Sequence, residues 1–256
     1  MSTATATLDL AGVDRRPGLG RLIAVELRKM VDTRAGFWVQ LGTLAAMVAL
    51  VVLNVIFGET KDQVYLDMLW SALWPASVLL PVIGVLLVSS EWSQRTATIT
   101  FVLVPERWRV IVAKVGAALV VAAVALAVSL VLGAIGTAIA SPGVDGTWTL
   151  ELDLLGQAGL YMVASMLMGL AFGAALLASA PAIVLYFVLP LTWAFVASIS
   201  IFEVPKRWLD TTETFAPLAE RTLSATEWAH VGTTVSLWVL LPLAIGLWRI
   251  RRSEIA

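Results

Sequence analysis

Histidine and cysteine, the side chains that most often carry metal and nucleophilic chemistry, are almost absent from this sequence. The 256 residues include one histidine, His230, and no cysteine. A zinc protease needs at least two histidines, as in H-E-x-x-H, and a serine protease needs a histidine within reach of its serine. No G-x-S-x-G motif occurs either. We therefore expect that the chain is not an enzyme and that it binds no metal.

The sequence also lacks the usual ATP-binding motif, because it has no G-x-x-x-x-G-K-[ST] phosphate-binding loop. If the protein is an active transporter, its ATP must be hydrolysed on another chain. We accordingly expect no cofactor on this chain, with ATP and magnesium held by a partner. His230, near the outer end of the last predicted span, is expected to be a solvent-reachable imidazole rather than a ligand.

The charged side chains that remain gather in a few short segments, of which the most informative is residues 91–114. In this segment the apolar stretch Ile99–Val104 stands between charged ends. An apolar surface on the water side of a membrane protein usually needs a cover. Either this stretch packs against the protein's own helix ends or dips into the membrane interface, or it docks a soluble subunit.

A second charged segment, residues 19–34, has the pattern of a basic amphipathic helix. Its apolar side chains recur at helical spacing, and its charged ones occupy the other side. Such a helix suits the cytoplasmic headgroup layer ahead of the first span. It is either a simple anchor or an elbow helix that also contacts a cytosolic partner. The candidate contact residues are Glu26, Arg28 and Lys29.

These segments frame long stretches without charge, and the composition as a whole is that of a membrane protein. The chain is 59% hydrophobic and 14% charged, with a mean hydropathy of +0.90. A soluble domain carries about 25% charged residues. The charge-free blocks are Ala35–Gly58, Met68–Ser90, Val115–Val144, Leu154–Phe202 and Trp228–Trp248.

A helix that crosses a bilayer needs about 20 apolar residues, so four blocks fit one span each. The block 154–202 suits two spans, broken near Ser179-Ala180-Pro181, because proline fits the first turn of a helix. The predicted fold class is an all-α integral membrane protein, with six transmembrane helices after the elbow helix. The predicted spans are about 37–57, 70–90, 112–138, 156–178, 181–202 and 228–248. Residues 1–18 are predicted to be a disordered cytosolic tail, and residues 35–256 form the transmembrane domain.

The distribution of lysine and arginine predicts the orientation of these spans. With both termini inside, the cytoplasmic segments hold 13 of the 17 basic residues. Their net charge is then +6, and that of the outer loops is −7. Six spans with both termini in the cytoplasm therefore satisfy the positive-inside rule.

Uncharged polar residues inside the blocks are the candidates for lining a pathway. They are Gln40, Asn54, Ser77 and Thr192. Each suits an interhelical hydrogen bond equally well, and we favour that interpretation. The ridge Ser165-x-x-x-Gly169-x-x-x-Gly173 predicts a close approach of helices within the chain rather than between chains. The outer loop 203–227 is long enough that we expect short helices in it.

The charged segments resemble those of a known family. The elbow Glu26-Leu27-Arg28-Lys29 and the ending Pro242-Leu243…Gly246-Leu247 followed by Arg249–Arg252 are similar to permease subunits of bacterial ABC exporters of the ABC-2 type. Arg95 is a departure, since many relatives have glycine there. The resemblance implies that the segment between spans two and three couples to an ATPase. Its residues are Glu91, Arg95, Thr96, Pro105, Glu106, Arg107 and Lys114.

The resemblance also implies a half-transporter in the bacterial plasma (inner) membrane. It would pair with a second permease, identical or different, and with two ABC ATPase subunits. The lipid bilayer is a further expected partner, and we expect no nucleic-acid partner. In this family the region 203–227 is part of an external gate. The alternative function is an ATP-independent carrier or channel, or a scaffold subunit of a membrane complex. A neighbouring gene for an ATPase, or an ATPase that co-purifies with this chain, would distinguish the exporter from this alternative.

Overall fold

The computed structural model describes residues 17–59, 64–94, 106–198 and 203–252, and within them every regular element is a helix. Six helical stretches are long and apolar enough to cross a membrane. The chain is therefore an all-α, multi-pass membrane protein. The spans are α2 (Arg34–Phe57), α3 (Tyr65–Ser93), α5 (Arg107–Ala140), α6 (Leu152–Leu176), α7 (Ser179–Ala197) and the continuous stretch Ala225–Arg252.

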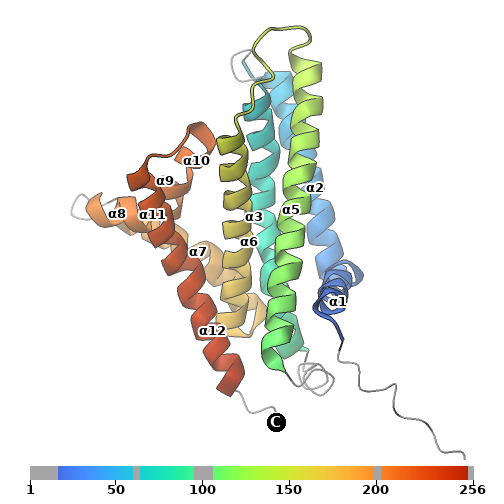
Figure 1. The fold of residues 1–256 in the computed structure, drawn as a ribbon, viewed down its shortest axis with the longest axis vertical. Helices are drawn as coiled ribbons and strands as arrows, with labels where there is room; N and C mark the ends of the chain where they lie inside the picture. The colour runs from blue at the N-terminus through green and yellow to red at the C-terminus, as the bar shows by residue number, and fades with distance from the viewer. Residues whose placement is uncertain (1–16, 60–63, 95–105, 199–202, 253–256) are drawn as a thin grey trace, which may run out of the picture.

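Helices α3 and α6 form the centre of the bundle, since most of each is buried. Helices α2 and α5 pack on one side of this pair, and α7 and the last span pack on the other (Figure 1). The outward faces of these four flanking spans are rich in exposed apolar side chains, as lipid contact requires. The fold thus surrounds one well-packed helix pair with four more lipid-facing helices.

The close contact between α3 and α6 depends on glycines, which have no Cβ atom. A Cβ atom on Gly169 would lie 2.1 Å from the carbonyl oxygen of Pro81, and one on Gly173 would lie 2.6 Å from that of Val85. From the other side, a Cβ on Gly84 would lie 2.8 Å from the carbonyl oxygen of Met166. Small residues let helix backbones approach this closely. The predicted close approach along the Ser165–Gly173 ridge is confirmed, and it lies within the chain.

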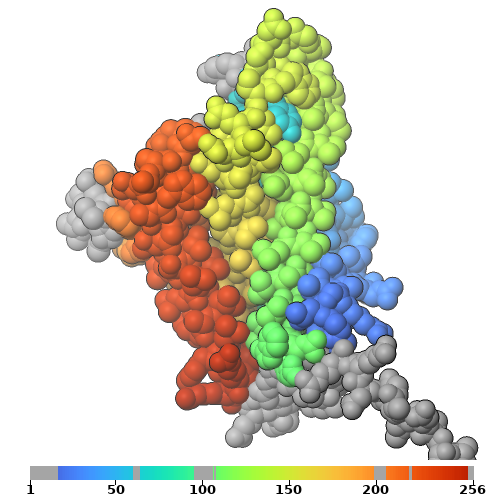
Figure 2. Space-filling model, viewed as in Figure 1, coloured from blue at the N-terminus to red at the C-terminus, as the bar shows by residue number. Residues whose placement is uncertain are grey.

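The predicted amphipathic helix is α1 (Leu19–Asp32), which lies across the bundle rather than along it (Figure 1). Figure 2 shows it against the lower part of α5. Thr33 separates α1 from α2, and its Oγ1 accepts a hydrogen bond from the backbone N–H of Gly36 at 3.2 Å. This N-cap starts the first span directly after the corner. The buried side chains of α1 are Glu26 and Met30.

Helix α6 ends at Leu176 and α7 begins at Ser179, where the sequence predicts a break. Leu177 has a left-handed backbone with φ of 54°, which ends α6. After α7 the chain forms three short helices in the region that the charge distribution places outside. They are α8 (Glu203–Leu209), α9 (Thr211–Phe215) and α10 (Pro217–Glu220).

The last span consists of α11 (Ala225–Val235), the π-helical turn η4 (Ser236–Leu240) and α12 (Leu241–Arg252). A capping box of Ser224 and Glu227 begins α11. Within η4, Trp238 donates from Nε1 to the carbonyl oxygen of Leu209 at 2.7 Å. This bond fastens the end of α8 to the last span.

Candidate functional site

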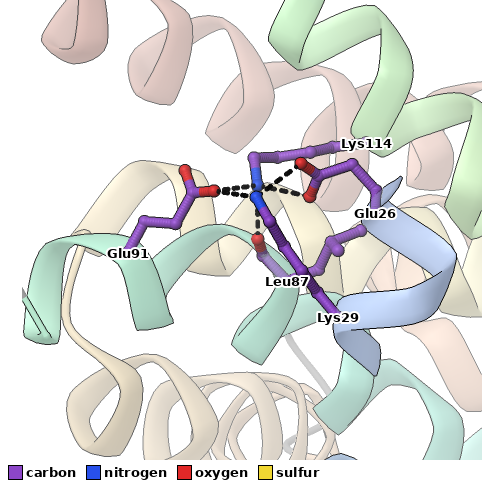
Figure 3. Close-up of polar contacts among 5 residues, drawn as sticks. All are labelled: Glu26, Lys29, Leu87, Glu91 and Lys114. Atoms are coloured by element: carbon purple, nitrogen blue, oxygen red, sulfur yellow. Dashed lines mark hydrogen bonds and ion pairs between the residues drawn. The ribbon is translucent and has the colours of Figure 1, made fainter. Parts of the chain in front are cut away.

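Four charged side chains meet at the end of the bundle that carries α1 (Figure 3). Lys114 Nζ donates to Glu26 Oε2 at 2.7 Å and lies 3.1 Å from Glu91 Oε1. Lys29 Nζ donates to Glu26 Oε1 at 2.8 Å and to Glu91 Oε1 at 2.7 Å. Lys114 also donates to the backbone carbonyl oxygen of Leu87 at 2.8 Å. We call Glu26, Lys29, Glu91 and Lys114 the ion network.

Burial makes the ion network more than a surface salt bridge. The side chains of Glu26, Glu91 and Lys114 are only 5%, 8% and 4% exposed, whereas that of Lys29 is 41% exposed. Two carboxylates face two ammonium groups, so the formal charges balance. The three N–H donors of Lys114 have three acceptors, from Glu26, Glu91 and Leu87. A buried ion pair is tolerated only with such complete pairing.

The ion network joins three helices that are far apart in sequence. Glu26 and Lys29 are three residues apart on α1 and therefore share one face. Glu91 lies in the last turn of α3, and Lys114 lies two turns into α5. Residues 95–105 connect these two helices. The network consequently fixes both sides of that connection to α1.

The charge of Lys29 is retained at neutral pH. Burial opposes the ammonium form of Lys29, but the carboxylates of Glu26 and Glu91 more than offset this, so its pKa lies above the ordinary 10.5. A raised pKa means that the stabilisation from Lys29 is fully present below about pH 10.5 and is lost only as the pH rises through the higher value. Lys29 thus remains an ammonium donor near neutral pH rather than a proton-dependent switch.

Some of the residues predicted to contact a partner are buried in the structure, others are exposed, and three lie outside the described residues. The side chains of Glu26, Glu91 and Lys114 are turned inward, so they position helices of this chain instead of forming an exposed docking surface. Arg28 is exposed on α1, with Asp32 at 4.0 Å, and Glu106 lies 3.8 Å from Arg109. Arg107 is the first residue of α5. The predicted residues Arg95, Thr96 and Pro105 lie outside the described residues.

Three of the four predicted pathway residues form hydrogen bonds within the chain. Gln40 Nε2 donates to the carbonyl oxygen of Met30 at 3.0 Å, which holds the corner between α1 and α2. Asn54 Nδ2 donates to Ser71 Oγ at 2.9 Å, and the hydroxyls of Ser77 and Tyr161 are bonded at 2.9 Å. The last two bonds join α2 to α3 and α3 to α6. Thr192 is exposed on α7, beside an apolar groove.

Gln157 on α6 is a structural residue that the sequence analysis missed. It is buried, and its Nε2 donates to the carbonyl oxygens of Leu218 at 3.1 Å and Arg221 at 2.9 Å. Its Oε1 accepts from the backbone N–H of Leu223 at 3.1 Å. One amide therefore holds the end of α10 and the chain that leads to α11. The only signal in the sequence is a glutamine inside an apolar block.

Replacement of Gln157 by leucine should release this part of the chain. The variant would lose three hydrogen bonds and leave buried backbone groups unpaired, at about 1–3 kcal/mol for each unpaired group. We expect protease cleavage within residues 217–224 of the folded protein in liposomes to become at least tenfold faster. Gln157→Glu keeps the Oε1 acceptor but places an oxygen instead of Nε2 against two carbonyl oxygens, so its cleavage should be at least as fast as that of the leucine variant. A cleavage rate equal to that of the unmodified protein would show that Gln157 does not hold the segment.

Among the described residues no group of three or more acidic or histidine side chains could hold a metal ion. The network can bear load, because its ion pairs join α1, α3 and α5. Comparison with known proteins adds no assignment, since no family model and no curated protein matches this chain.

Proposed function

We propose that this chain is the transmembrane permease subunit of an ATP-driven ABC exporter. The observation that carries the proposal is the ion network, which joins the amphipathic helix α1 to both helices that flank residues 95–105. A segment that receives force from a soluble motor needs such anchorage on both sides. Loose flanks would absorb the movement locally instead of passing it to the spans.

Three further features support the proposal. The segment 91–114 has an apolar stretch, Ile99–Val104, that suits the cover of a soluble subunit. The chain has no phosphate-binding loop, so the motor must be a separate chain. The central pair α3 and α6 runs from the network end towards the start of α6, beside which α10 packs (Figure 1).

In the proposed assembly, two ATPase subunits dock on the connection between α3 and α5 of two permease chains. Closure of the ATPase pair would push this connection, and the ion network would move α1, α3 and α5 together. The spans would then alternate between states open to either side. Because the charge-free spans offer few polar groups, a hydrophobic or amphipathic cargo is favoured. The location would be the bacterial plasma (inner) membrane.

Purification of the chain from its native membrane in a mild detergent tests the proposal. We expect an ATP-hydrolysing subunit to co-purify with the unmodified protein. Phe101→Asp combined with Val104→Asp should reduce its recovery at least tenfold, because two charges enter the proposed docking stretch. Val144→Asp, in the turn at the opposite end of the bundle, is the matched control and should leave recovery unchanged.

All three proteins must first be recovered from membranes in equal amounts, which shows normal insertion. Absence of any ATPase from every preparation, together with transport that persists after ATP depletion, would favour an ATP-independent carrier instead. Equal recovery of the ATPase with both kinds of variant would mean that it binds elsewhere than residues 99–104.

A further inference from the structure

A groove of about 420 Å³ lies at the ion-network end of the bundle, between the α1–α2 corner, the end of α3 and the start of α7. Its volume is within the range of small-molecule sites, about 300–1,000 Å³. A hydrogen bond between the hydroxyls of Ser179 and Ser89 at 2.9 Å holds the start of α7 to α3. Gln40 holds the corner through the carbonyl oxygen of Met30. The groove is therefore bounded by anchored elements.

The lining of the groove changes from apolar to polar along α3. The polar part lies at the last turn of this helix, and the apolar part lies deeper in the bundle. Ile83 and Ser90 are seven residues apart, which is about 10 Å along a helix axis. A molecule with a polar head and an apolar chain would match this order. The uncharged residues of α3 in the lining are Ile83, Leu86, Leu87, Ser90, Ser93 and Gln94.

Three polar side chains in the groove can bind a head group. A lysine ammonium has three N–H donors, and Lys29 uses two of them for Glu26 and Glu91. Lys29 lines the groove and its side chain is 41% exposed, so a bound molecule can reach the third donor. Ser90 is half-buried and Gln94 is exposed, and neither side chain forms a hydrogen bond within the described residues.

The charges of the lining favour a head group without charge. Of the two charged lining residues, Lys29 is the accessible one, because the side chain of Glu91 is only 8% exposed. The four charges of the ion network already balance, so a phosphate would lose its hydration without meeting a net positive charge. A cationic head would lie beside Lys29 with no accessible carboxylate in the lining. Hydroxyl groups avoid both costs, and they can accept from Lys29 and bond to Ser90 and Gln94.

We propose that this groove binds a lipid of the cytoplasmic leaflet whose head is uncharged and carries hydroxyl groups, such as a monoacylglycerol. The head bonds to Lys29, Ser90 and Gln94, and the acyl chain lies along Ile83 and Leu86. Helix α1 is basic and amphipathic, which suits the headgroup layer and sets the groove at the depth of such a head. The site does not depend on the proposed exporter function, and its test involves no ATPase.

The probe is a monoacylglycerol with a photoactivatable diazirine in its acyl chain. On illumination the diazirine loses nitrogen gas and leaves a carbene, which inserts into a nearby C–H bond. The full chain in phosphatidylcholine nanodiscs would be labelled, digested and mapped by mass spectrometry. We expect the label on the apolar lining, at Met30, Ile83 or Leu86. Unlabelled monooleoylglycerol should compete for this site, whereas equal amounts of dioleoylphosphatidylglycerol, which is anionic, or of glycerol, which has no chain, should not.

Two substitutions on α2 test the position of the site. Ala35 is exposed and lines the groove, so Ala35→Trp fills the space and should reduce the labelling at least about tenfold. Ala45 is exposed on the same helix outside the lining. Ala45→Trp is therefore the matched control and should leave the labelling unchanged.

Ser90→Ala combined with Gln94→Ala tests recognition of the head. The double variant removes two hydrogen-bonding groups and leaves the ion network intact, so labelling should fall about tenfold. Neither residue is fully buried, and the variant is expected to insert and fold normally.

Loss of label in Ala35→Trp and in the double variant, with competition by monooleoylglycerol alone, supports the proposal. Unchanged labelling of the double variant would show that the groove takes up any apolar chain and would overturn it. Stronger competition by dioleoylphosphatidylglycerol than by monooleoylglycerol would rule out the uncharged head. Competition by glycerol would rule out a lipid as the occupant.

Discussion

Replacement of Lys114 by methionine is expected to destabilise the protein by about 3–5 kcal/mol, the cost of removing one partner from a buried ion pair. Methionine has nearly the length of lysine, so the variant removes charge and donors with little change of volume. Glu26 and Glu91 would then share the single ammonium group of Lys29 in a buried setting. The carbonyl oxygen of Leu87 would also lose its bond with Lys114.

The free energy of unfolding can be followed by denaturant titration of the purified protein in detergent. Arg28→Met is the matched control, because Arg28 is 83% exposed and its pair with Asp32 is a surface pair. It should cost less than about 1 kcal/mol. Adding Glu26→Gln to Lys114→Met restores charge balance and should recover part of the loss. A single variant as stable as the control would show that the ion network contributes nothing.

The spans could be predicted from the sequence because a bilayer excludes charge over a length that is physically fixed. The block 154–202 was too long for one span, and the structure divides it between Leu176 and Ser179. Proline at 181 favours the start of a helix there. The packing of Gly169 within the chain was also predictable, since small residues at a spacing of four form one face.

The ion network could not be predicted, because its pairs are specified by tertiary structure. Glu26 and Lys114 are separated by 88 residues. Glu26 was expected to contact a partner from the elbow helix and Lys114 to belong to the ATPase-coupling segment, and both positions equally suit exposed contacts. Their burial depends on how α1 crosses α5, which residue periodicity does not determine.

The hydrogen-bond partners of Gln157, an uncharged residue, could not be predicted from the sequence either. A glutamine among apolar residues predicts some hydrogen bond, but the partners here are backbone groups of Leu218, Arg221 and Leu223. Backbone groups are present at every residue, so sequence cannot identify them. Helices α8, α9 and α10 are likewise too short to show a clear periodic pattern in the sequence.

Substitution of Gly169 by alanine is expected to cost about 3 kcal/mol, the upper part of the usual range for overpacked cores, although it adds only one methyl group. The new Cβ would lie 2.1 Å from the carbonyl oxygen of Pro81 and 2.6 and 2.7 Å from its carbonyl carbon and Cα. All three atoms belong to backbone, so no side-chain rotation can relieve the overlap. Helices α3 and α6 would have to separate, and separation loses dispersion contacts along the whole pair.

Gly156→Ala on the same helix is the matched control, since no atom lies within 4 Å of its Cβ position. It should be neutral or stabilising by about 0.5–1 kcal/mol, because alanine is the better helix former. Both variants would be compared by denaturant titration in detergent. Opposite signs at two glycines of α6 would show that contact with α3, and not helix propensity, determines the response. Equal values would mean that α3 and α6 are free to separate, and the close α3–α6 contact would then not be essential to the fold.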